Sequence, residues 1–155
     1  MLSIDVNEAL AGIDMMLRRA ADPLPVLSRI GASEVENVRA RIRGSKTSPW
    51  GDSWAPWAPS TRAHREHKGN ADQGLLWDDG DLLKSIRYDA QVGAYLGGSL
   101  GVLEVGSDMP YAAFLQYGTE KMPARKFLGW SPVMFPIYEQ LLAGWIEHGD
   151  ERANF

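Results

Sequence analysis

The chain has 155 residues, of which 45% are hydrophobic and 23% are charged, values near those of average globular proteins rather than of disordered chains. It contains no cysteine, which excludes disulfides, thiolate nucleophiles and cysteine-based zinc sites. The net charge is -4 and no apolar run reaches the roughly 18 residues of a membrane-spanning helix, so neither a general nucleic-acid binder nor a membrane protein is indicated. We expect residues 1–155 to form a single domain.

The first helix is predicted to begin at Asp5, which together with Glu8 fits a capping box that satisfies backbone amides at a helix start. Apolar residues then recur every three or four positions until Pro23 and define one stripe along the helix. The members of this stripe are Val6, Leu10, Ile13, Leu17 and Ala20. Because such a stripe gains stability only by burial, we expect a partner surface to cover it.

A second, longer helix is predicted to have Pro25 in its first turn and to stop at Gly44. Its apolar positions at helical spacing are Leu27, Gly31, Val35, Val38 and Ile42. Four basic residues gather near its end, namely Arg39, Arg41, Arg43 and Lys46. We expect them chiefly to form a solvated face that suits the negative end of the helix dipole, and contact with DNA phosphates stays open.

Residues 44–80 are rich in Ser, Pro, Gly and Asp and are predicted to form a long loop, which is usually functional or mobile at such a length. The loop contains Trp50, Trp54 and Trp57, and burying one tryptophan removes about 200 Å² from water. We hypothesise that these three residues anchor the loop on a neighbouring surface. The alternative is that they cover their own domain.

The second half of the chain predicts a hairpin between helices. Asp81 is predicted to cap a short helical turn, after which residues 86–92 and 100–105 are β-prone and flank several glycines. A short helix is predicted from Pro110 to Gly118, and a final amphipathic helix over residues 132–146. The predicted fold class is therefore α+β, with N-terminal helices, a small antiparallel β-sheet with a central hairpin, and a C-terminal helix packed on it.

One short segment matches a catalytic motif. Residues 97–101 fit the G-x-S-x-G nucleophile elbow, which places a serine, here Ser99, between a strand and a helix. The sequence after it instead predicts a strand, and His148 is the only later histidine. We therefore predict that the glycines form a hairpin turn and that Ser99 has no catalytic role.

Metal and cofactor sites are not predicted. His64 and His67 can share a helix face, but no third ligand accompanies them. The aspartates at 78, 79 and 81 lack the spacing of a calcium loop, so turn and capping roles explain them more simply. The glycines near residue 97 fit no phosphate-binding or dinucleotide motif.

Short blocks with a characteristic order run through the last two thirds of the chain. The first are Ser48-Pro49-Trp50-Gly51, Trp54-Ala55-Pro56, Ser60-Thr61, Gly80-Asp81-Leu82 and Ser85-Ile86. The later ones are Val105-Gly106-Ser107, Tyr111-Ala112, Gln116-Tyr117-Gly118 and the segment from Pro123 to Gly129. From about Ser48 to Ile146, the chain thereby resembles the phage virion morphogenesis and tail-completion family. It departs from the pattern at Leu115, where that family leads us to expect His.

The resemblance implies a structural phage protein without enzymatic activity or cofactor, acting as a tail-completion, neck or tail-terminator subunit that enables tail and head to join. Its implied partners are other virion proteins, such as tail tube, connector or neck proteins, and copies of itself in a ring of, for example, six subunits. The implied location is the head-tail junction of the virion, after assembly in the bacterial cytoplasm. A head-side capsid assembly protein is the alternative, ahead of a serine hydrolase using Ser99 or a nucleic-acid-binding module.

Aromatic residues and arginine dominate the energetics of protein interfaces, and they gather between residues 111 and 128. The hypothesised assembly interface consists of Tyr111, Gln116, Tyr117, Pro123, Arg125, Phe127 and Leu128. The alternative is an internal turn in which Phe127 and Leu128 fill the core and Arg125 pairs with a nearby carboxylate.

Overall fold

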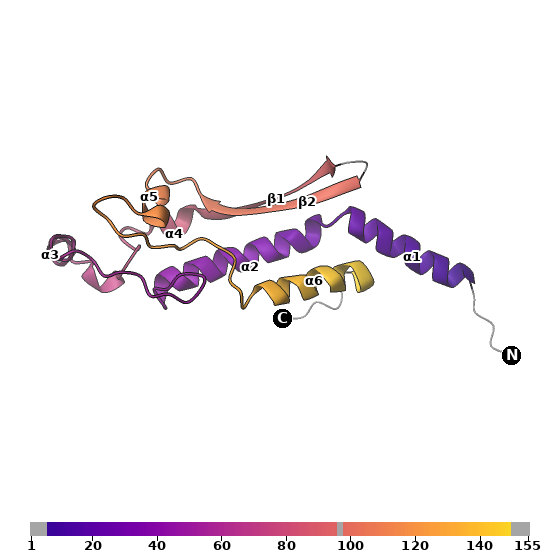
Figure 1. Cartoon of the computed structure of the whole chain (residues 1–155), viewed down its shortest axis with the longest axis horizontal. Helices are drawn as coiled ribbons and strands as arrows, with labels where there is room; N and C mark the ends of the chain where they lie inside the picture. Colours follow the sequence, from indigo (N-terminus) through magenta and orange to yellow (C-terminus); the bar gives the residue numbers. More distant parts are fainter. Residues whose placement is uncertain (1–5, 96–97, 150–155) are drawn as a thin grey trace.

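The computed structural model describes residues 6–95 and 98–149, which form an elongated α+β structure and confirm the predicted fold class (Figure 1). The helices are α1 (Val6–Ala21), α2 (Leu24–Arg43), α3 (Pro59–Lys68), the short 3-10 helix η1 (Ala71–Gln73), α4 (Asp81–Ser85), α5 (Ala112–Tyr117) and α6 (Phe135–His148). Strands β1 (Ile86–Tyr95) and β2 (Gly98–Ser107) form an antiparallel hairpin. Helix α2 lies between this hairpin and α6 (Figure 1).

The two N-terminal helices follow the sequence prediction closely. Helix α1 ends before Pro23, and Asp5, its predicted cap, lies outside the described residues. Helix α2 carries Pro25 in its first turn and ends at Gly44, whose amide donates to the carbonyl of Ala40 at 2.8 Å. Because proline lacks an amide hydrogen, the first turn is where it costs a helix least.

The hairpin packs one face on α2. Its register pairs Tyr88 with Val105 and Ala90 with Leu103, so these side chains share the face that meets the helix. Gly31 of α2 permits this close approach, since a Cβ atom there would lie 2.5 Å from the Tyr88 ring and 2.9 Å from a methyl of Leu103. The hairpin connection, residues 96 and 97, lies outside the described residues.

Helix α2 contributes to two hydrophobic clusters along its length. The larger joins its C-terminal half to the hairpin and the loop segments, and its buried members are Val35, Val38, Ile42, Trp54, Leu82, Leu83, Ile86, Ala112 and Phe127. The smaller joins its N-terminal half to α6 through Val26, Ile30 and Tyr138, with Leu103 of β2 packed against them. Helix α6 therefore packs mainly on α1 and α2 rather than on the sheet, because α2 already covers one face of this two-stranded ribbon.

A buried polar network fixes α6 against α2. The Glu34 carboxylate accepts a hydrogen bond from the Tyr138 hydroxyl at 2.8 Å and pairs with the Arg41 guanidinium at 2.9 Å. Asn37 donates to the same hydroxyl at 3.0 Å. Burial raises the pKa of Tyr138 to about 12, so the phenol stays protonated and able to donate. A buried carboxylate requires such partners, and they define how α6 lies on α2.

The range 44–80 differs from the predicted continuous loop because it contains α3 and η1. Helix α3 buries none of its residues, so it has no apolar stripe by which the sequence could have revealed it. Charge pairs support it instead, with Arg65 and Lys68 lying 2.9 and 2.8 Å from the Asp78 carboxylate. These hydrogen-bonded cations lower the pKa of Asp78.

The predicted capping role of Asp81 is wrong. Gly80 precedes α4 with a positive φ of 86°, and Asp81 is the first helical residue, without a side-chain capping bond. The other late elements match better. Helix α5 stops at Gly118 as predicted, and Pro136 lies in the first turn of α6.

The close contact at Gly31 generates a stability prediction. Replacing Gly31 with Ala should force the Tyr88 ring to move, and overpacking of this kind costs about 1 to 3 kcal/mol, more than the roughly 1 kcal/mol that alanine contributes by helix propensity. We expect Gly31→Ala to lower the free energy of unfolding measured by denaturant titration. Gly12→Ala on α1 is the matched control, because nothing lies within 4 Å of its added Cβ, and it should leave stability equal or higher.

Candidate assembly interface

Two segments that carry the family-like blocks, residues 48–57 and 123–129, are fastened to each other. The Trp54 indole donates to the carbonyl of Lys126 at 3.0 Å. The Arg125 guanidinium donates from Nε to the carbonyl of Ala55 and from Nη2 to that of Pro56, both at 2.9 Å. The backbone carbonyls of these irregular segments have no neighbouring strand or helix to bond with, so the two side chains serve as their hydrogen-bond donors.

Gln116 of α5 holds the second segment from its other side. Its Oε1 accepts the amides of Phe127 and Leu128 at 3.0 and 3.1 Å, and its Nε2 donates to the Leu128 carbonyl at 2.9 Å. The Gln116 side chain thus makes hydrogen bonds to the backbone of residues 127–128 that a neighbouring strand would make in a sheet. It positions the Phe127 ring, which is completely buried in the larger cluster.

The structure therefore places much of the hypothesised interface inside the subunit. Arg125 is only 6% exposed, and its partners are backbone carbonyls instead of the expected carboxylate. Phe127 fills the core, as in the internal-turn alternative, and Leu128 packs beside it. Buried side chains offer no surface to another chain, so the role of Arg125 and Phe127 as surface anchors is corrected to one of internal support.

The three loop tryptophans have different environments. Trp54 is buried in the larger cluster and covers its own subunit. Trp57 is half-buried, with the Arg65 guanidinium 5.2 Å from the centre of its ring. Trp50 remains exposed beside Gly129, with the Lys126 ammonium 5.9 Å from its ring centre. Only Trp50 keeps a largely free aromatic surface for a neighbouring chain.

At Leu115, the apolar side chain packs partly buried against the larger cluster. Its carbonyl accepts the Arg125 amide at 2.7 Å, a backbone bond that does not depend on the side chain. A leucine therefore suits this position, and the departure from the family pattern leaves the junction between α5 and residues 123–129 intact.

Exposed aromatic side chains gather along α5 and the residue before it. Tyr111, Phe114 and Tyr117 are 40%, 57% and 78% exposed. Their spacing of three places them near one face of the helix. Phe114 was not among the predicted contacts, although this spacing in the sequence could have revealed it. Pro123 is also exposed, so the part of the hypothesised interface that remains available is formed by Tyr111, Tyr117 and Pro123.

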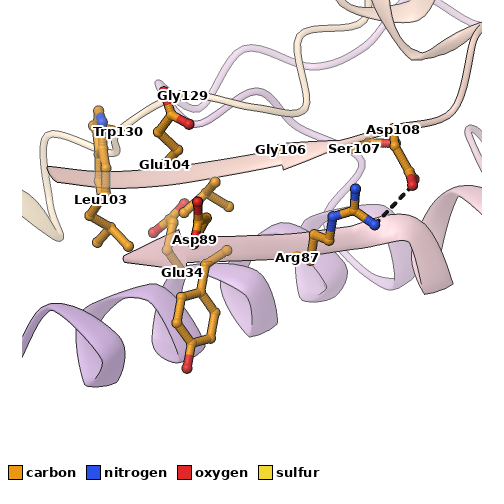
Figure 2. A pocket seen from close by; sticks show the side chains of 12 residues that line it. Glu34, Arg87, Asp89, Leu103, Glu104, Gly106, Ser107, Asp108, Gly129 and Trp130 are labelled. Atoms are coloured by element: carbon orange, nitrogen blue, oxygen red, sulfur yellow. Dashed lines mark ion pairs between the residues drawn. The ribbon is translucent and has the colours of Figure 1, made fainter. Parts of the chain in front are cut away.

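A groove of about 790 Å³ runs along the hairpin (Figure 2). It is lined by residues of both strands, by Glu34 of α2 and by residues 129–130. At one end Arg87 pairs with Asp108 at 2.8 Å, while Trp130 and Leu103 line the other end (Figure 2). Asp89 and Glu104 lie directly opposite each other in the strand register, where like charges repel. The groove is therefore an open acidic surface.

Neither the nucleophile motif nor the histidine pair of the sequence forms a site in the described residues. Ser99 lies in β2, paired with Ala94, and the chain continues as strand to Ser107, so the predicted antiparallel pairing is confirmed and no strand-to-helix elbow forms. Gly98 and Gly101 belong to β2, and the predicted turn at residues 96–97 lies outside the described residues. His64 and His67 are exposed on α3. In residues 6–95 and 98–149, no group of three or more His, Cys, Asp or Glu side chains is placed to hold a metal.

The basic residues at the end of α2 mostly bind their own chain. Arg39 donates to the carbonyls of Leu83 and Ile86, both at 3.1 Å, and Arg41 pairs with buried Glu34. The Lys46 ammonium donates to the carbonyls of Ile42, Gln73 and Leu75. The expected solvated face is thus largely a set of internal supports, and the contact with DNA that the sequence left open is not tested by the structure.

The exposed aromatic side chains of this small α+β fold are typical of a subunit that associates with other chains. Comparison with known proteins agrees with this class. The model of the phage virion morphogenesis family matches residues 4–139, and the chain belongs to this family. No curated protein and no solved structure matches significantly.

The family match begins at residue 4, just before α1 and well before the blocks by which the sequence resembled the family, and reaches into α6. Both N-terminal helices are therefore part of the family pattern. Across the described residues, no helix is long and apolar enough to cross a membrane.

The internal role of Arg125 gives a second prediction. Arg125→Ala removes two hydrogen bonds from a charged group, to the carbonyls of Ala55 and Pro56, and a hydrogen bond of this kind contributes about 1.5 to 3 kcal/mol. We expect a clear fall in the midpoint of thermal unfolding. Lys121→Ala, at an exposed position four residues before Arg125, serves as the control and should unfold at the same temperature as the parent chain. Equal midpoints for both variants would contradict the internal role.

Proposed function

We propose that the chain is a non-enzymatic structural subunit of the head-tail junction, acting as a tail-completion or neck/tail-terminator protein that enables tail and head to join. Its partners in this role are other virion proteins, such as tail tube, connector or neck proteins, together with further copies of itself in a ring. The observation that carries the proposal is membership of the phage virion morphogenesis family over residues 4–139. Its site of action is the virion, after assembly in the host cytoplasm.

The amount of exposed surface supports a role in assembly. The accessible surface of the chain is 10471 Å², whereas a compact chain of 17.1 kDa exposes about 7,800 Å². Even if the residues outside the described ranges contributed the full surface of an unfolded segment, about 2,000 Å², the remaining surface would exceed by roughly 1,000 Å² the about 7,300 Å² that a compact chain of the described length exposes. A standard interface covers about 800 Å² per partner, so the excess suits a subunit that is completed by neighbours.

The apolar character of the exposed surface also supports a role in assembly. Among the described residues, large apolar side chains that are exposed outnumber those that are buried. At the α3–α5 end of the molecule they include the exposed aromatic residues of α5 (Figure 1). We propose that Tyr111, Tyr117 and Pro123, with Phe114 beside them, form the contact with neighbouring virion proteins at this end, because exposed aromatic groups dominate interface energies.

Removal of the gene from the phage distinguishes the proposed roles by electron microscopy of lysates. Complete heads and complete tails that stay unjoined support a junction protein, and overlong tails identify a tail terminator. Defective heads beside normal tails would instead assign the chain to head-side capsid assembly, which is the alternative. Normal infectious particles would contradict all three roles.

Replacing the most exposed aromatic residue tests the proposed contact surface. Tyr117→Ala removes a side chain that is 78% exposed, so the subunit should keep its stability. If Tyr117 is an interface anchor, its loss typically costs about 2 kcal/mol or more of binding, and infectious titre should fall at least about tenfold in a complementation assay. Phe135→Ala, at an exposed aromatic of α6 away from this end, is the control. A normal titre for Tyr117→Ala would remove Tyr117 from the interface.

A further inference from the structure

Helices α1 and α3 lie at opposite ends of the molecule and are the most exposed of its longer helices (Figure 1). On the apolar stripe of α1, Leu10, Ile13 and Leu17 are 58%, 54% and 64% exposed, so the expected partner surface is absent from the described part of the chain. Helix α3 has no such stripe, and each of its residues except Arg65 is exposed. Apolar burial therefore does not hold α3 in place.

The carboxylate of Asp78 is the main point at which α3 is attached. Its Oδ1 accepts hydrogen bonds from the Arg65 guanidinium at 2.9 Å, from the Lys68 ammonium at 2.8 Å and from the Asn70 amide. Lys68 also donates to the carboxylate of Asp79 at 2.9 Å. Both aspartates lie in the segment that leads from η1 to α4, so these bonds fasten α3 to a later part of the chain.

The segment that contains α3 is held at each of its ends by a different group. Before it, the Pro56 carbonyl accepts a hydrogen bond from the Arg125 guanidinium at 2.9 Å. After it, the Gln73 carbonyl accepts one from the Lys46 ammonium at 3.2 Å. Between these two anchored points lie residues 58–72, which we call the strap.

We propose that the strap opens from the body of the subunit while the rest of the fold stays intact, and that the Asp78 carboxylate holds it closed. Segments with few buried apolar contacts and solvent-exposed hydrogen bonds open more easily than a core. The side chains of Asp78 and Lys68 are 48% and 38% exposed, and pairs between such groups are weak and screened by salt. The body is instead held by two hydrophobic clusters.

Opening of the strap changes the surroundings of the proposed aromatic contact surface. Arg65 of the strap and Tyr111 line the same pocket of about 320 Å³. The other residues that line it are Leu76, Asp78, Asp79, Asp81 and Leu82. When the strap opens, Arg65 leaves this pocket and a neighbouring chain gains access to Tyr111 from that side. This consequence rests on the proposed function, whereas the opening itself does not.

Native-state hydrogen exchange of the purified full-length chain, followed by mass spectrometry, tests the role of Asp78. A helix of 10 residues is marginal in water once it is undocked, so the amides of α3 exchange when the strap opens. Asp78→Asn removes the charge that three donors share, and exchange in α3 should become at least about tenfold faster, with α2 and the hairpin unchanged.

Asp108→Asn is the matched control for this experiment. The Asp108 side chain is 53% exposed and pairs with Arg87 of the hairpin at 2.8 Å, so the variant loses a similar carboxylate away from the strap. It should leave exchange in α3 as in the parent chain. Unchanged exchange in α3 of Asp78→Asn, or a rise of equal size in α2 and the hairpin, would overturn the proposal.

Salt tests the same attachment in the parent chain, so the result does not depend on the folding of a variant. Raising NaCl from about 0.1 M to about 1 M shortens the Debye length from about 10 Å to about 3 Å. At constant pH, exchange in α3 should become faster while exchange in α2 stays the same, and Asp78→Asn should lose most of this salt effect. A parent chain whose α3 exchange does not respond to salt would show that charge does not hold the strap. The chain is studied alone, so a failure here leaves the role at the head-tail junction untouched.

Discussion

The structure depends on the burial of α2 from two sides. Its apolar residues at helical spacing meet the hairpin and loop segments along one part and α6 along another. The hairpin alone has two strands and α6 is amphipathic, so neither is expected to be stable without this helix. Gly31 permits the close approach of the hairpin, and Glu34 binds Tyr138 of α6. The identity of a few α2 residues therefore determines how the hairpin and α6 are placed.

The irregular segments are held by another means. Residues 48–57 and 123–129 form no sheet. Their backbone groups make hydrogen bonds to side chains in place of a neighbouring strand. Hydrogen bonds from Arg125, Trp54 and Gln116 are directional, so they position Phe127 in the core more precisely than apolar contact alone would. The blocks that resemble the family are thus largely explained as supports of the subunit itself.

The subunit nevertheless leaves much apolar surface exposed at both of its ends. A stable monomer rarely exposes apolar patches of this kind, because water contact with apolar surface is unfavourable. A protein that functions inside a large particle can leave such surface for its neighbours to cover. The elongated shape and the uncovered stripe of α1 are both expected of a subunit whose remaining apolar surface is covered by neighbouring chains, as proposed above.

The sequence by itself determined the local structure and the family. Apolar spacing gave α1, α2 and α6, glycines and prolines marked their ends, and β-prone runs gave the hairpin, because these signals depend on neighbours along the chain. Helix α3 was missed, since charge pairs with Asp78 stabilise it in place of an apolar stripe. Only the tertiary structure decided that Arg125 and Phe127 lie inside while Tyr117 and the α1 stripe lie outside. An arginine or aromatic residue suits a core and an interface equally well by its chemistry, and which of the two it joins is determined by contacts between segments far apart in the sequence.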